Sequence, residues 1–257
     1  MIFSITRSTL GAGYFLLTMN NNTFRLRTIL YDGILLTIIF LFFWFHRSQT
    51  LAGDAPLITR ITEGGKWFVK NELLSQAIIQ FTYQLFSPWH ITSLEVMNLL
   101  SCLGGIFSIY ILMQISRKIF AVSIFWPLLL FCSSGFVIYS CGHTEYYPIF
   151  LPAMLLYGYF GLAYLMGKAD MLVVTLTFVL ACALHMGMFI AFPSLILLPV
   201  LQECYSDYRK IVFGFLFFIP LLIIRNYPEI TGFSAAGLSP AWNFLPLFPY
   251  QDMYRYY

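Results

Sequence analysis

The chain has 257 residues, of which 60% are hydrophobic, 19% are aromatic and only 10% are charged, and its mean hydropathy is +0.79. This composition excludes a water-soluble globular protein and indicates a polytopic membrane protein. The net charge of +3 comes from scattered residues, so the sequence offers neither a nucleic-acid groove nor a polybasic lipid-binding segment, and no nucleic-acid partner is expected.

Apolar runs of roughly the 20 residues that a membrane span needs predict the transmembrane helices. In chain order the single spans cover residues 28–45, 94–115, 119–139, 149–166 and 211–224. The run from Met171 to Leu201 has 31 residues, more than one span needs, and predicts two short helices that turn near His185. The expected fold is all-α, a polytopic transmembrane bundle of about seven spans.

Lysines and arginines in the short connections predict the orientation, because these residues favour the cytoplasmic side. They share one side of the membrane only if residues 171–201 cross it twice. Residues 1–27 are then a cytoplasmic segment and residues 28–225 the transmembrane module. The first loop (46–92), the link that ends at Pro148, the turn at His185 and the tail (226–257) face the other side.

The first loop predicts two amphipathic helices that lie in the membrane interface. "GDAPLITRITEGG" predicts a helix that follows Asp54 and stops at Gly64 and Gly65. "NELLSQAIIQFTYQLFSPW" predicts a second helix, with apolar residues on one face and glutamines on another, that ends at Pro88 and Trp89.

Asp54 has two interpretations that do not exclude each other. An aspartate before Ala-Pro is a common N-cap, which begins a helix. A carboxylate at the membrane surface can also act as a general base and accept a proton from an acceptor hydroxyl.

The link "SCGHTEYYP", from Ser140 to Pro148, is polar and lies between two apolar runs. In an extended conformation, His143 and Glu145 project to the same side. Tyrosines alone are typical of an aromatic belt at the membrane interface. A His-x-Glu pair can in addition hydrogen-bond a sugar or help to bind a phosphate-linked metal ion. His185 is either a lone histidine satisfied by a backbone carbonyl or a further member of such a site.

The order of these segments resembles that of the polytopic GT-C glycosyltransferases of the protein mannosyltransferase (family 39) type. The shared features are a first span, a long loop that starts at Asp54 in "GDAPLITRI", interfacial helices, and closely spaced spans with a polar link after the third. The resemblance covers residue 28 to the end of the chain. It implies a multi-pass enzyme of the bacterial cell membrane, or of the endoplasmic reticulum in a eukaryote. Such an enzyme transfers a sugar from a polyprenyl-phosphate-linked donor to a glycan, lipid or protein hydroxyl outside the cytoplasm.

The resemblance implies that Asp54 is the catalytic base. It also implies that His143 and Glu145 help to form the donor or acceptor cleft. Further candidates for binding the donor and its phosphate are Arg60, Tyr146, His185 and Arg225. Many members carry two acids close together in the first loop, whereas here Ala55 follows Asp54, so no cofactor is assigned and a divalent metal ion stays an open alternative. Because family members are usually longer, the end at "YQDMYRYY" predicts a truncated chain.

Two other classes of protein fit the apolar composition. A transporter or lipid flippase is expected to bury charged residues at mid-span, and the predicted spans hold almost none there. A non-catalytic membrane assembly subunit needs no convergent polar groups. The spatial arrangement of the polar residues therefore distinguishes these classes from an enzyme.

Overall fold

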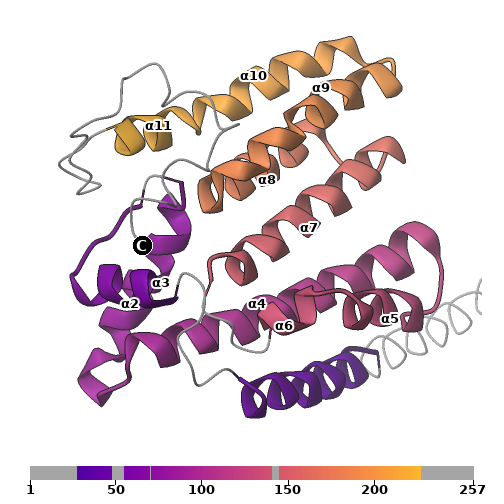
Figure 1. Ribbon diagram of the computed structural model, residues 1–257. Coiled ribbons are helices and arrows are strands. Elements are labelled where there is room, and N and C mark those ends of the chain that lie inside the picture. The colour runs from indigo at the N-terminus through magenta and orange to yellow at the C-terminus, as the bar shows by residue number, and fades with distance from the viewer. Residues whose placement is uncertain (1–27, 48–54, 70, 141–144, 227–257) are drawn as a thin grey trace, which may run out of the picture. The chain divides into compact units, whose positions relative to one another are not determined.

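The computed structural model describes residues 28–47, 55–69, 71–140 and 145–226 (Figure 1). Within these ranges all regular elements are helices, which confirms the all-α class. Three helices are long and apolar enough to cross a membrane: Thr28–Phe45, Ser93–Phe120 and Tyr147–Leu165. They coincide with the first, second and fourth predicted spans and support a multi-pass membrane protein.

Most of the first helix, Thr28–Phe45, belongs to a compact unit of its own that ends at Phe42. Within this helix the Thr37 hydroxyl donates a hydrogen bond of 2.8 Å to the Gly33 carbonyl. This internal bond satisfies a polar group that lipid cannot satisfy.

The second unit is built around α4 (Ser93–Ile115), α7 (Tyr147–Leu165) and α8 (Met171–Leu184), and α7 lies between the other two (Figure 1). A capping box begins α4: the Glu95 carboxylate accepts a hydrogen bond of 2.8 Å from the Thr92 backbone N–H, and the Glu95 N–H donates to the Thr92 hydroxyl. A π-helical turn, Ser116–Phe120, extends α4 to Ala121.

Two consecutive glycines in α4 allow neighbouring backbone to approach closely. A β-carbon at position 104 would overlap the carbonyl oxygen of Pro148, in the first turn of α7. A β-carbon at position 105 would lie 2.5 Å from the β-carbon of Ser140. Small residues have this role at helix contacts in membranes, where close packing replaces the hydrophobic effect. The polar link between Ser140 and Pro148 is therefore fastened to α4 at both of its ends.

Residues 119–139, predicted as one span, form two short helices instead. They are α5 (Phe125–Ser133) and α6 (Phe136–Ser140), and Ser134, between them, is extended. The Ser134 hydroxyl donates to the Phe131 carbonyl at 2.7 Å. Serine side chains that bond to nearby carbonyls compete with the helix, and Gly135 weakens it further.

The last predicted span, residues 211–224, is also broken. It consists of α10 (Tyr208–Leu216) and α11 (Ile219–Asn226). Pro220 has no N–H and its ring would clash with the carbonyl of Leu216 in a continuous helix, so the chain breaks before it.

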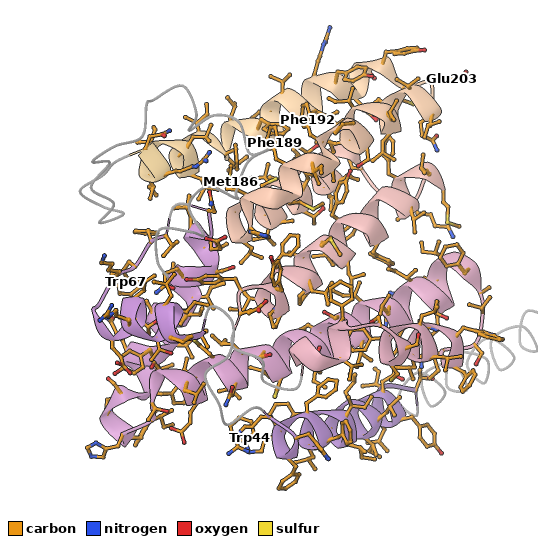
Figure 2. All side chains as sticks on the ribbon, in the orientation of Figure 1. Trp44, Trp67, Met186, Phe189, Phe192 and Glu203 are labelled. Atoms are coloured by element: carbon orange, nitrogen blue, oxygen red, sulfur yellow. The ribbon has the colours of Figure 1, made fainter. Side chains whose placement is uncertain are left out.

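The predicted turn at His185 is confirmed. α8 ends at Leu184, and His185 is extended, with φ −152° and ψ 113°. A 3₁₀ segment (Met186–Ala191) and α9 (Phe192–Leu201) follow. The aromatic core of this region surrounds Phe178, which is fully buried, and the rings of Phe189 and Phe192 stack 5.2 Å apart beside it (Figure 2).

Both predicted loop helices are present. α2 (Ala55–Glu63) ends at Gly65, whose φ of 73° suits glycine, and Gly65 donates to the Thr62 carbonyl. α3 (Leu73–Phe86) ends in a 3₁₀ turn, Ser87–Trp89.

The faces of α3 differ from those of a simple surface helix. Gln76 and Gln80 are buried against the rest of the second unit, whereas Phe81 and Leu85 are 60% and 53% exposed. The Gln76 side chain hydrogen-bonds to Tyr146, Lys66 and Thr62, which makes its burial favourable, whereas Phe81 and Leu85 are left outward, as lipid contact requires.

At the end of α7 and the start of α8, polar and charged side chains contact the start of α10. The Tyr164 hydroxyl donates to the Asp207 carboxylate at 2.7 Å. The Lys210 ammonium lies 2.6 Å from the Asp170 carboxylate and 3.0 Å from that of Asp207. The Lys210 ammonium and the N–H of Leu172 hold the pKa of Asp170 below its ordinary value of 3.8.

A depressed carboxyl pKa stabilises the fold above its ordinary value, and this stabilisation is lost as the pH falls through the folded-state pKa. Replacing Asp170 with Asn keeps the N-cap but removes the charge. We expect this variant to melt roughly 1–3 °C lower than the unmodified chain at pH 7. Thermal unfolding of detergent-purified protein measures the difference, which should shrink as the pH falls below 3.8. A difference that persists unchanged in acid would contradict the ionic contribution.

Candidate functional site

The site is centred on His185, between the end of α8 and the start of α3. Nδ1 of His185 lies 3.3 Å from a carboxylate oxygen of Glu72, the residue that precedes α3. Hydrogen bonds hold this junction on both sides: the Met186 N–H donates to the Asn71 carbonyl at 2.9 Å, and the Ser75 hydroxyl donates to the Leu184 carbonyl at 2.8 Å. The histidine and the carboxylate are therefore fixed relative to each other.

Two aromatic rings from α7 fix the plane of the imidazole. The His185 ring meets the rings of Tyr147 and Phe150 edge to face, at centroid distances of 5.4 Å and 5.3 Å. The side chains of His185 and Glu72 are 23% and 16% exposed. Both side chains are thus largely covered and keep only a small exposed fraction.

Arg225, near the end of α11, brings a positive charge to the same carboxylate. Burial lowers the pKa of the Arg225 guanidinium below its ordinary value, and the negative charge of Glu72 partly opposes this shift, so Arg225 lies within electrostatic range of the carboxylate. Glu72, His185 and Arg225, which we call the His185 cluster, combine one acid, one imidazole and one permanent cation. Such a set can hold a phosphate or hydrogen-bond hydroxyl groups.

The polar link contributes Tyr146 beside this cluster. The Tyr146 hydroxyl donates a hydrogen bond of 2.8 Å to Oε1 of Gln76 on α3. The Gln76 amide in turn donates to the Lys66 carbonyl at 3.0 Å and to the Thr62 hydroxyl at 3.3 Å. Tyr146 therefore fastens the link to α2 and α3, and the neighbouring Tyr147 reaches His185.

Several polar side chains of α3 and α4 are buried, which is unusual for a chain of this composition. Buried hydroxyl and amide side chains come from α3 and α4 and include Ser75, Gln76, Gln80, Ser93, Asn98 and Ser101. Oε1 of Gln80 has no hydrogen-bond partner among the described residues. A buried acceptor of this kind is normally paired with a water molecule or a ligand hydroxyl.

The structure brings together some of the residues predicted for the site. His185 and Arg225 share the cluster, and Tyr146 lies on the adjoining part of α3. Glu145 is in the described link next to Tyr146, whereas Arg60 is an exposed residue of α2, and the described contacts do not join its side chain to the cluster. Asp54 and His143 lie outside the described residues.

Glu72 was not singled out from the sequence. In "NELLSQ" it reads as an ordinary acid before a helix, although its side chain makes no capping hydrogen bond. Its relation to His185 is set by the tertiary fold, and local spacing carries no sign of it. Among the described residues, no group of three histidine, cysteine or acidic side chains is placed to hold a metal ion.

Comparison with known proteins finds no matching family, no matching curated protein and no matching solved structure. The function is therefore inferred from the side chains and their arrangement.

Proposed function

We propose that this chain is a GT-C type glycosyltransferase, which transfers a sugar from a polyprenyl-phosphate-linked donor to a non-cytoplasmic acceptor hydroxyl. The observation that carries the proposal is the His185 cluster, which lies beside the amphipathic helices α2 and α3. The acceptor is a glycan, lipid or protein. The proposed location is the bacterial cell membrane, or the endoplasmic reticulum of a eukaryote, with about seven membrane crossings.

The distribution of charge supports the proposed orientation. α7 runs from Tyr147, beside His185, to the turn at Lys168, and α8 returns from Asp170 to His185. Lys210 joins Asp170 at the end away from the cluster. Lysines at that end are typical of the cytoplasmic side, which leaves the His185 cluster on the outer side, where a lipid-linked sugar would be used.

The chemistry follows from the nature of the leaving group. A polyprenyl phosphate leaves as a stable anion, so the protein mainly has to align the acceptor, remove its proton and stabilise the departing charge. In the proposal, Asp54 is the base and Arg225 with His185 steadies the phosphate. Glu72 contacts His185 and places a negative charge near Arg225. His143 and Glu145 keep the donor-binding roles that the family resemblance implies.

The role of Arg225 provides the test of this assignment. Replacing Arg225 with Gln removes a charge-assisted contact to the phosphate, and we expect the KM for the donor to rise roughly 10- to 100-fold. The assay follows the release of polyprenyl phosphate from radiolabelled polyprenyl-phosphate mannose by membranes that contain the chain. Arg225→Lys should retain part of the affinity, because it keeps the charge but loses the planar fork.

The matched control is Arg209→Gln, an exposed arginine at the start of α10. This variant should turn over the donor like the unmodified chain. Equal KM values for the Arg225 and Arg209 variants, at equal protein abundance, would remove Arg225 from the site.

A transporter or lipid flippase is the second candidate, because three apolar stretches are broken, at Ser134, at His185 and before Pro220. Discontinuous helices commonly form substrate sites in transporters. The same assay separates the two functions: a flippase moves the lipid-linked sugar without cleaving it, so no free polyprenyl phosphate would be released.

A further inference from the structure

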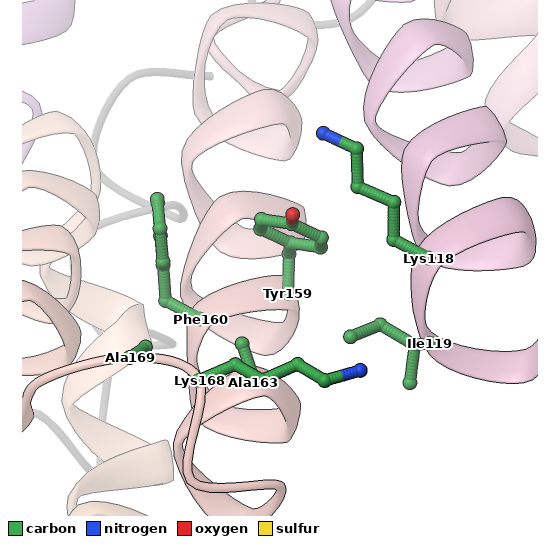
Figure 3. Close-up of a pocket in the computed structure, with 7 residues that line it drawn as sticks. All are labelled: Lys118, Ile119, Tyr159, Phe160, Ala163, Lys168 and Ala169. Carbon is green, nitrogen blue, oxygen red and sulfur yellow. The ribbon is translucent and has the colours of Figure 1, made fainter. Parts of the chain in front are cut away.

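A cavity lies at the end of α4 and α7 that is away from the His185 cluster. It has a volume of about 350 Å³ and is formed by the π-helical turn after α4, the last part of α7 and the turn that leads to α8 (Figure 3). Its lining is mostly apolar and consists of Lys118, Ile119, Tyr159, Phe160, Ala163, Lys168 and Ala169. We call it the lysine cavity.

Backbone hydrogen bonds fix the positions of the main chain at Lys118 and Lys168. Lys118 belongs to the π-helical turn, which is closed by a hydrogen bond of 3.1 Å from the Val122 N–H to the Ser116 carbonyl. Lys168 follows Gly167, whose φ is 67°, and its N–H donates to the Ala163 carbonyl at 2.8 Å. This is a Schellman motif. The two side chains extend on either side of the Tyr159 ring (Figure 3).

No acidic residue in the lining neutralises the positive charge of the cavity. The lining holds two ammonium groups and no acid. The ion pairs found between described residues join Lys210 to Asp170 and Asp207 and do not include Lys118 or Lys168. An anion would therefore complement this cavity, and a phosphate is the group for which paired lysines are suited.

The position of the cavity indicates the source of the phosphate. Two candidate membrane spans, Ser93–Phe120 and Tyr147–Leu165, end beside it. In a bilayer that these helices cross, the head groups would lie near the ends of the spans, and basic pockets between transmembrane helices on the cytoplasmic side commonly bind anionic lipids. Apart from Tyr159, the rest of the lining is isoleucine, phenylalanine and alanine, which suits an acyl chain.

We infer that the lysine cavity binds an anionic phospholipid of the surrounding bilayer, with the phosphate between Lys118 and Lys168 and an acyl chain against Ile119 and Phe160. This site is separate from the proposed transferase site, and it does not depend on that activity. The lipid would join the end of α4 to the turn between α7 and α8 and so stabilise the bundle.

Thermal unfolding of the full chain in neutral maltoside micelles tests the inference. Phosphatidylglycerol at about ten times its Kd should raise the midpoint by roughly 3–6 °C, and phosphatidylcholine should not. The double variant Lys118→Gln with Lys168→Gln should lose this shift. Arg209→Gln, which removes one exposed positive charge outside the cavity, should keep it.

Three results would overturn the site. The first is an equal shift with phosphatidylcholine, which would make the effect one of bulk lipid. The second is a full shift in the double variant, which would place the lipid elsewhere. The third is an equal shift with inorganic phosphate alone, which would make the ligand a soluble anion.

Discussion

Replacing Asp54 with Asn is expected to reduce sugar transfer by roughly 100-fold or more, the contribution of a general base. Asparagine is as good an N-cap as aspartate, so this change preserves the alternative role of residue 54 at the start of α2, whose first residue is Ala55. The variant therefore separates the two interpretations. A helix cap alone predicts no loss of activity, whereas a base predicts nearly complete loss.

The measurement is the initial rate of polyprenyl phosphate release at saturating donor, with protein abundance determined in the same membranes. Glu203→Gln is the matched control, because Glu203 is an exposed acid after α9, at the end away from the His185 cluster (Figure 2). It should retain the full rate. Full activity in the Asp54 variant would end the proposed mechanism, whatever the behaviour of Arg225.

The largest effect on stability is expected at Gly104. A methyl group there would overlap the carbonyl oxygen of Pro148, and backbone cannot rotate away as a side chain can. α7 would have to move from α4, and we expect Gly104→Ala to cost about 3 kcal/mol or more, which lowers the melting temperature by roughly 6–12 °C. Thermal unfolding in detergent provides the measurement.

Gly158→Ala is the control for helix propensity. Gly158 lies in the interior of α7, and a β-carbon there meets no atom within 4 Å among the described residues. Because alanine favours the helix over glycine by about 1 kcal/mol, this variant should be neutral or slightly more stable. Similar melting temperatures for the two variants would show that the contact at Pro148 does not control packing.

The helices could be predicted from the sequence where local chemistry decides the structure. α2 and α3 lie where the glycine and proline signals of the first loop indicate. The apolar run 171–201 is too long for one span, and it is interrupted at His185. The breaks at Ser134 and before Pro220 were missed because hydropathy treats an apolar run as uniform. Proline and backbone-bonding serine act through hydrogen bonds, which hydropathy does not measure.

The site was only partly predictable, for a related reason. A glutamine on a helix reads as a solvent-facing residue until its partner is known, and the partner of Gln76 is Tyr146, 70 positions away. Glu72 is informative only beside His185. Sequence patterns report neighbours three or four positions apart, and buried polar pairs between distant elements leave no such pattern.

The hydrogen bond from Ser75 to Leu184 joins residues 109 positions apart. The His185 cluster can therefore assemble only after both parts of the chain have been synthesised. Glu72 is synthesised early, with the first loop, whereas Arg225 is one of the last described residues to leave the ribosome. The groups that would hold a phosphate stay separated until α8 and α11 are inserted. A partly inserted chain thus carries no assembled cluster, and under the proposed function donor binding would report on complete insertion of the bundle.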